Sequence, residues 1–235
     1  MTSDLLLVVD VGSTFTKAAL VDPGTGAVHG RGETPTTLDT DVMDGVRTLA
    51  TTLGDPTAVV EERVLACSSA GGGLRLAVVG YERTVTAEAG YRVGLSAGAK
   101  VVHVATGALD PAGVEELVAV RPDIVLLVGG TDGGNSEVLE HNGSALAAAA
   151  LPPGVPVVVA GNLEGQPAVA AALERAGRPH VRADNVLPEI GVVAPESARL
   201  AIREVFLRHV IGGKGLSRDP AFARVVRAAT PDAVL

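Results

Sequence analysis

The first 80 residues alternate short apolar runs with clusters of Asp, Pro, Gly and Thr that favour turns. A longer segment with helical periodicity interrupts them at 42–53, where residues 39–41 offer an N-cap and Gly54 a stop. The runs expected to form strands cover residues 5–11, 16–21, 27–33, 64–67 and 74–79. The pattern therefore predicts three strands, a helix and then further strands.

From about Thr84 the chain changes to a regular alternation of strands and helices. Four Val-rich runs lack polar alternation, and each of the first three is followed by a turn and a segment of helical character. Such strands are expected where helices cover both faces of a parallel sheet. The four runs span residues 101–104, 124–128, 155–159 and 180–183. Beyond them, Pro195 and the pair Asp219-Pro220 each open a helical segment.

These patterns predict an α/β fold in three parts. The order of strands and helix in residues 1–83 is typical of a ribonuclease-H-like half-domain. Residues 84–190 are predicted to form a doubly wound parallel unit inserted after it, and residues 191–235 a helical segment.

Composition and charge exclude several classes of protein. Of the 235 residues, 47% are apolar and 20% charged, which is typical of a globular protein and excludes disorder and a coiled coil. The 19 basic and 27 acidic residues give a net charge of −8, and aromatic residues make up 2%, so we expect no nucleic-acid partner. No apolar run approaches the roughly 18 residues of a membrane span. We therefore expect no membrane partner. Because Cys67 is the only cysteine, we also expect a cytoplasmic protein.

The sharpest local motif joins the first two predicted strands and reads Asp-Val-Gly-Ser-Thr-Phe-Thr-Lys over residues 10–17. A tight turn at its glycine brings backbone N–H groups close to an anion, and the hydroxyl and ammonium groups add further donors. Asp10, at the strand end, suits a hydrated Mg²⁺ ion, which prefers carboxylate and water oxygens. The alternative is an ordinary hairpin turn with a solvated lysine. The predicted phosphate ligands are Gly12, Ser13, Thr14, Thr16 and Lys17.

A second group of polar residues follows the strands of the predicted parallel sheet. The carboxyl ends of such strands form the edge where ligands bind, and helix N-termini attract anions there. Gly, Asp and Asn are also the residues that strand-to-helix turns and helix caps require, so pure turn chemistry is the alternative. The residues predicted to form a ligand edge are Thr106, Gly129, Gly130, Thr131, Asp132, Asn135, Asn162, Asp184 and Asn185.

Residues 10–17 resemble the first phosphate loop of the actin-like ATPase superfamily. Four further segments resemble one branch of it, the glutamate-mutase accessory family called MutL or GlmL, which is unrelated to the mismatch-repair MutL. These segments cover residues 67–74, 122–135, 160–162 and 183–188. The resemblance implies ATP and Mg²⁺ as cofactors and subunits of an adenosylcobalamin-dependent aminomutase, of glutamate or ornithine mutase type, as partners. It further implies an accessory or reactivating role.

The chain departs from that family in one respect. Members are about twice as long, and their second half carries another phosphate loop of the form Asp-x-Gly-Gly-Ala-Thr-Thr-Asp, which we do not find here. We therefore expect the nucleotide-binding first lobe of such a factor, with its second lobe missing and with ATP hydrolysis only in the full-length protein. The alternatives are a sugar or acyl kinase of the same superfamily and a non-catalytic ligand-binding module. No residue is assigned a catalytic role.

Overall fold

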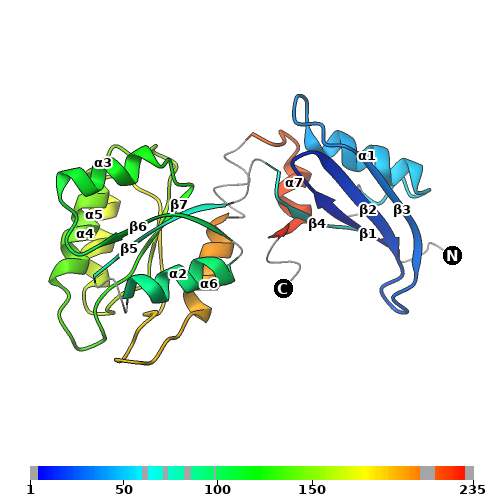
Figure 1. Ribbon diagram of the computed structural model, residues 1–235. Helices are drawn as coiled ribbons and strands as arrows, with labels where there is room; N and C mark the ends of the chain where they lie inside the picture. The colour runs from blue at the N-terminus through cyan, green and yellow to red at the C-terminus, as the bar shows by residue number, and fades with distance from the viewer. Residues whose placement is uncertain are drawn as a thin grey trace. The chain divides into compact units, whose positions relative to one another are not determined.

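The computed structural model describes residues 5–59, 63–70, 74–81, 86–97, 99–206 and 215–230 (Figure 1). The chain is a mixed α/β protein with two five-stranded sheets. It divides into two compact units, each described by itself below. Unit 1 comprises Met1–Gly73 and Val210–Leu235, and unit 2 comprises Leu74–His209. Within the described residues, no helix combines the length and the apolar character needed to cross a membrane.

The sheet of unit 1 has the strand order β10-β4-β1-β2-β3. The bounds of its strands are Leu6–Val11 (β1), Phe15–Val21 (β2), Val28–Pro35 (β3), Val64–Ser68 (β4) and Val226–Ala229 (β10). The first three strands form an antiparallel meander, whereas β4 runs parallel to β1 and β10 runs parallel to β4. Strand β2 is therefore antiparallel to both of its neighbours.

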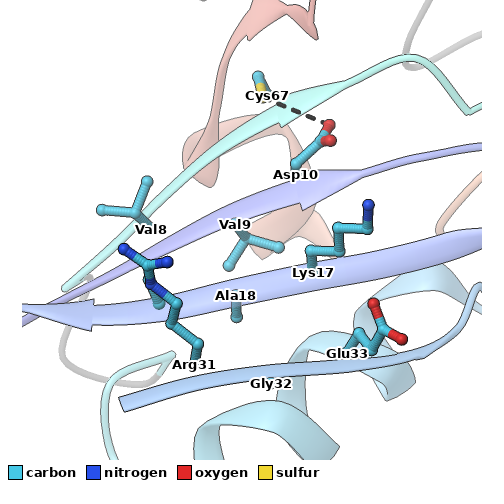
Figure 2. A pocket seen from close by; sticks show the side chains of 10 residues that line it. Val8, Val9, Asp10, Lys17, Ala18, Arg31, Gly32, Glu33 and Cys67 are labelled. Atoms are coloured by element: carbon cyan, nitrogen blue, oxygen red, sulfur yellow. Dashed lines mark hydrogen bonds between the residues drawn. The ribbon is translucent and has the colours of Figure 1, made fainter. Parts of the chain in front are cut away.

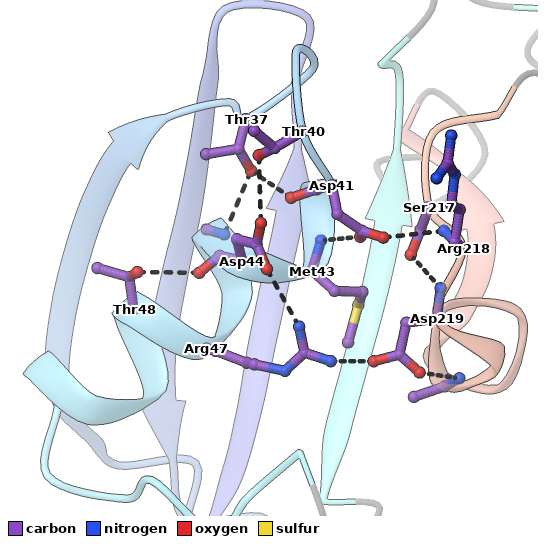
Figure 3. A network of polar contacts seen from close by, with 12 residues as sticks. Thr37, Thr40, Asp41, Met43, Asp44, Arg47, Thr48, Ser217, Arg218 and Asp219 are labelled. Carbon is purple, nitrogen blue, oxygen red and sulfur yellow. Dashed lines mark hydrogen bonds and ion pairs between the residues drawn. The ribbon is translucent and has the colours of Figure 1, made fainter.

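Two helices, α1 (Val42–Thr52) and α7 (Pro220–Val225), pack on the sheet of unit 1, and each begins at an aspartate cap. Asp41 accepts hydrogen bonds from the backbone N–H groups of Met43 and Arg218, at 2.9 and 2.8 Å. Asp219, the cap of α7, also pairs with Arg47 of α1 (Figure 3). This polar network fixes the start of α7 beside the start of α1, although 177 positions separate Asp41 from Arg218.

The sheet of unit 2 is wholly parallel and has the order β6-β5-β7-β8-β9. Its strands are Arg75–Gly80 (β5), Lys100–Thr106 (β6), Ile124–Leu127 (β7), Val157–Val159 (β8) and His180–Arg182 (β9). The first strand of unit 2, β5, lies second in this order, between β6 and β7. Strand order reverses between β5 and β7, as in a doubly wound sheet.

Helices cover both faces of this sheet, as the apolar strands predicted. They are Thr86–Ser96 (α2), Pro111–Ala119 (α3), Glu137–Ala148 (α4), Gln166–Arg175 (α5) and Glu196–Val205 (α6). On one face, Leu117, Leu146 and Leu173 from α3, α4 and α5 share a buried cluster with Val125 and Leu127 of β7. Helices α2 and α6 contact each other as well as the strands.

The structure divides the chain differently from the predicted boundaries at 83/84 and 190/191. Strand β5 opens the sheet of unit 2, although its residues were assigned to the first part. The predicted helical segment 191–235 is split, because α6 belongs to unit 2 while α7 and β10 return to unit 1. Strand β10 was not predicted. A short apolar run fits either sheet equally well, so its partner strands decide where it belongs.

Candidate functional site

The predicted phosphate loop is a tight turn between β1 and β2. The backbone N–H of Gly12 donates to the carbonyl oxygen of Phe15 at 3.1 Å. A Cβ atom on Gly12 would lie 2.7 Å from that oxygen, so the turn excludes any side chain at this position. Ser13 and Thr14, at the tip, are exposed. The loop therefore offers hydroxyls and backbone groups to solvent.

Behind the loop, a row of polar side chains crosses four strands on one face of the sheet. In register, Asp10 of β1 lies opposite Lys17 of β2 and Cys67 of β4, and Lys17 lies opposite Glu33 of β3. These four side chains line a pocket of about 510 Å³ (Figure 2). The next row along the strands is largely apolar and contributes Val8, Ala19 and Arg31. The structure thus brings Asp10 and Lys17 together beside the loop.

The carboxylate of Asp10 accepts from two donors, Cys67 on β4 and Thr230 directly after β10. Thr230 donates its hydroxyl to Oδ1 at 2.7 Å, and the thiol of Cys67 donates to the same oxygen at 3.5 Å. Burial raises the pKa of the Cys67 thiol, and the charge of Asp10 adds to this effect, so the thiol stays protonated and can donate. Thr230 was not among the predicted site residues, because no local sequence pattern joins the region around residue 230 to β1.

The side chains beside the loop of unit 1 offer few ligands for Mg²⁺. In the described part of the chain, no cluster of three or more His, Cys, Asp or Glu side chains could hold a metal ion. Asp10 alone would hold Mg²⁺ only together with waters and phosphate oxygens, which is how that ion is commonly bound beside nucleotides. The residues present therefore fit a hydrated ion and not an all-protein cage.

Thr16, also predicted to bind phosphate, lies on the other side of β2. Its side chain is fully buried, and its hydroxyl oxygen is 3.1 Å from that of Thr36. Thr36 in turn donates its hydroxyl to the carbonyl oxygen of Gly12 at 2.8 Å. This placement puts Thr16 behind the loop, where it supports the turn and does not face the pocket. Thr36 was not singled out from the sequence.

In unit 2, several of the predicted edge residues meet where β7, β8 and β9 end. Asn162 donates its side-chain amide to the carbonyl oxygens of Thr131 and Gly134, at 2.7 and 3.0 Å. Asn185 donates to the carbonyl of Gly130 at 3.0 Å and to Asp132 at 2.9 Å. Both amides are buried. Their hydrogen bonds connect the loop after β7 to the loops after β8 and β9.

The glycines of that loop have backbone conformations that favour glycine. Gly129, Gly130 and Gly133 have φ angles of 144°, 72° and 72°. Gly129 follows β7, and Tyr81, which is 41% exposed, follows β5. These two positions flank the point where strand order reverses, which is the usual ligand position in such sheets. A ligand at this edge remains a prediction.

The other predicted edge residues lie apart from this cluster or on its surface. Thr106 ends β6 and lines a separate pocket of about 280 Å³ with Leu109 and Glu116. Asn135 is exposed and accepts a hydrogen bond from the N–H of Glu137 at the start of α4. The N–H of exposed Asp184 donates to the hydroxyl of a serine, Ser197. The edge is therefore not one continuous site.

Comparison with known proteins relates the chain to a sequence family and, distantly, to solved structures. The model of a family described as "MutL protein" matches residues 6–235. The chain is 36% identical to "Protein MutL" of Clostridium tetanomorphum over 235 residues, which cover 99% of this chain and 50% of that protein. The chain thus spans about half the length of this curated relative. A solved structure, the activator of the 2-hydroxyisocaproyl-CoA dehydratase from Clostridium difficile with bound ADPNP, matches 92% of this chain and 99% of its own at 10% identity, with a TM-score of 0.22.

Proposed function

Because the chain belongs to the MutL protein family, which is the glutamate-mutase family of that name and not the mismatch-repair one, we propose that it is the nucleotide-binding first lobe of an accessory ATPase. The partner proposed for this factor is an adenosylcobalamin-dependent aminomutase in the cytoplasm. The single observation that carries nucleotide binding is the tight turn at Gly12, which opens beside a pocket lined by Asp10 and Lys17.

The strand order of unit 1 supports a ribonuclease-H-like half-domain, the fold that actin-like ATPases use for each lobe. Three antiparallel strands, a helix and two parallel strands follow one another as β1, β2, β3, α1, β4 and β10. Unit 2 enters between β4 and α7 as an insertion. We propose that this insertion contacts the partner or a ligand, while unit 1 holds the nucleotide.

Charges in the pocket specify which form of the nucleotide would bind. Lys17 lies between the carboxylates of Asp10 and Glu33, and with Arg31 of the next row the charged side chains of the pocket sum to zero. A free triphosphate would therefore meet no net positive charge in the pocket, and Mg²⁺ supplies compensating positive charge when it is bound. Asp10 would hold the ion through water, and Lys17 with the exposed loop would hold the phosphates. We therefore expect binding that depends strongly on Mg²⁺.

The test is calorimetry of ATP binding, with and without Mg²⁺, to the full-length protein. Lys17→Ala should weaken Mg-ATP binding by roughly 10- to 100-fold, because it removes a charge-assisted contact. Asp10→Asn should chiefly reduce the gain in affinity that Mg²⁺ provides. Arg31→Ala is the matched control, since it removes one positive charge from the next row of the same pocket. Unchanged affinity in both Lys17→Ala and Asp10→Asn would overturn the assignment and leave an ordinary hairpin.

A further inference from the structure

Thr36, the first residue after β3, contacts the phosphate loop at two of its backbone carbonyls. Its backbone N–H donates to the carbonyl oxygen of Thr14 at 2.9 Å. Its hydroxyl donates to the carbonyl oxygen of Gly12 at 2.8 Å and lies 3.1 Å from the hydroxyl of Thr16. Because the one hydroxyl proton of Thr36 goes to Gly12, the hydroxyl of Thr16 must be the donor in the second contact. The hydroxyl of Thr16 thus donates to the hydroxyl of Thr36, which in turn donates to the carbonyl of Gly12.

These bonds fix the direction of two backbone N–H groups in the loop. In a trans peptide, the C=O of one residue and the N–H of the next point in opposite directions. The carbonyls of Gly12 and Thr14 both point at Thr36, so the N–H groups of Ser13 and Phe15 point away from it. Backbone N–H groups of a turn that point away from the protein interior can form a concavity that binds phosphate.

We propose that Thr36 is a positioning residue for nucleotide binding: it holds the loop so that the Ser13 and Phe15 N–H groups face a bound phosphate. This inference rests on the proposed nucleotide site. Thr36 would act through its contacts with Gly12 and Thr14 and is assigned no contact with the nucleotide. Its hydroxyl restrains the carbonyl of Gly12, the residue whose turn leaves no room for a side chain.

The test compares three variants of the full-length protein by calorimetry with Mg-ATP. Thr36→Val keeps the shape and the backbone N–H but removes the hydroxyl, so affinity should fall about three- to tenfold. Thr36→Ser restores the hydroxyl and should bind within about twofold of the parent protein. Thr37→Val is the neighbouring control, because its hydroxyl bonds the carbonyl of Asp41 at 2.5 Å and the N–H of Gly45 at 3.3 Å, at the start of α1. It should lower the melting temperature without lowering affinity.

The outcomes separate this inference from the proposed function. If the parent protein binds Mg-ATP but Thr36→Val binds equally well, or Thr36→Ser is as weak as Thr36→Val, Thr36 does not position the loop. If the parent protein binds no Mg-ATP, the proposed function and the inference both fail. Should Thr36→Val not fold, Thr36→Ala takes its place in the same comparison with Thr36→Ser.

Discussion

Each unit places a glycine-containing loop after a strand of its sheet, yet the polar side chains around the two loops are arranged in opposite ways. In unit 1, Asp10 and Lys17 project from the sheet into a pocket that is open to solvent. In unit 2, the amides of Asn162 and Asn185 are buried and bond backbone carbonyls of the loop itself. The loop of unit 1 therefore lies beside charged side chains that are open to solvent, whereas the loop of unit 2 is held by buried neutral amides.

The difference follows from the chemistry of the side chains. An amide carries both donors and an acceptor, so it can be buried at little cost once every group is paired. Asn162 meets this condition, since its oxygen accepts from the N–H of Glu164 at 2.8 Å while its nitrogen donates twice. A charged group loses far more on leaving water, which favours keeping Lys17 exposed. Polar residues of similar loops therefore divide into those that shape the loop and those that remain available to a ligand.

The largest effect should come from filling the tight contact beneath the loop of unit 2. A Cβ atom on Gly161 would lie 2.6 Å from the carbonyl oxygen of Gly129 and 2.7 Å from Leu139. Gly161→Ala should therefore destabilise unit 2 by about 3 kcal/mol, because backbone atoms must move. Gly154→Ala is the control, since nothing lies within 4 Å of its added Cβ atom. Hydrogen exchange measured by peptide reports each unit separately, and equal protection in the two variants would contradict the close approach.

A somewhat smaller effect is expected from the amide of Asn162. Asn162→Ala removes two donated hydrogen bonds and one accepted bond and leaves carbonyls unpaired, which should cost unit 2 about 2–3 kcal/mol. Mg-ATP affinity should stay within about twofold, whereas Lys17→Ala should show the reverse pattern, with weaker binding and little change in stability. Unfolding by urea and calorimetry on both variants test this contrast. Loss of ATP affinity in Asn162→Ala would show that the two loops do not have separate tasks.

The sequence predicted most elements of both units but not which sheet each strand joins. Apolar periodicity and the expected cap within residues 39–41 located α1, whose observed cap is Asp41. The residues of β5 were recognised as a strand yet assigned to the wrong unit, because its apolar pattern suits a buried position in either sheet. Strand β10 was missed because residues 226–229 follow α7 without a turn signal, and only pairing with β4 makes them a strand.

The candidate site shows the same limit at the level of single side chains. Spacing identified Asp10, Gly12 and Lys17, because a strand–turn–strand pattern fixes which residues flank a turn. Alternation along β2 also implies that Thr16 and Lys17 face opposite sides, but that inference needs the strand boundary to be known. Thr36 and Thr230 reach the loop and Asp10 from positions 24 and 220 residues away, and no local pattern announces such contacts.

The smallest expected effect is a dependence of the stability of unit 1 on pH. It arises because charged side chains titrate whereas neutral amides do not. In unit 1, Arg63 donates to both carboxylate oxygens of Asp55, at 2.5 and 3.0 Å, and this interaction, with a contribution from Thr57, lowers the pKa of Asp55. Since the pKa is lower in the folded state, the stabilisation is complete above the unfolded-state value of about 4 and is lost as pH falls through the folded-state value.

The neutral amide of Asn162 bonds backbone groups alone, so its hydrogen bonds should persist at low pH. Between pH 7 and pH 3, hydrogen exchange should therefore increase around Asp55 before it increases in the loop of unit 2, after correction for intrinsic rates. Asp55→Asn should cost unit 1 about 1 kcal/mol at pH 7, because the ion pair becomes a weaker neutral contact, and should flatten its pH dependence. If the variant and the parent protein lose protection around residue 55 over the same pH range, the Asp55–Arg63 pair is not the group that titrates there.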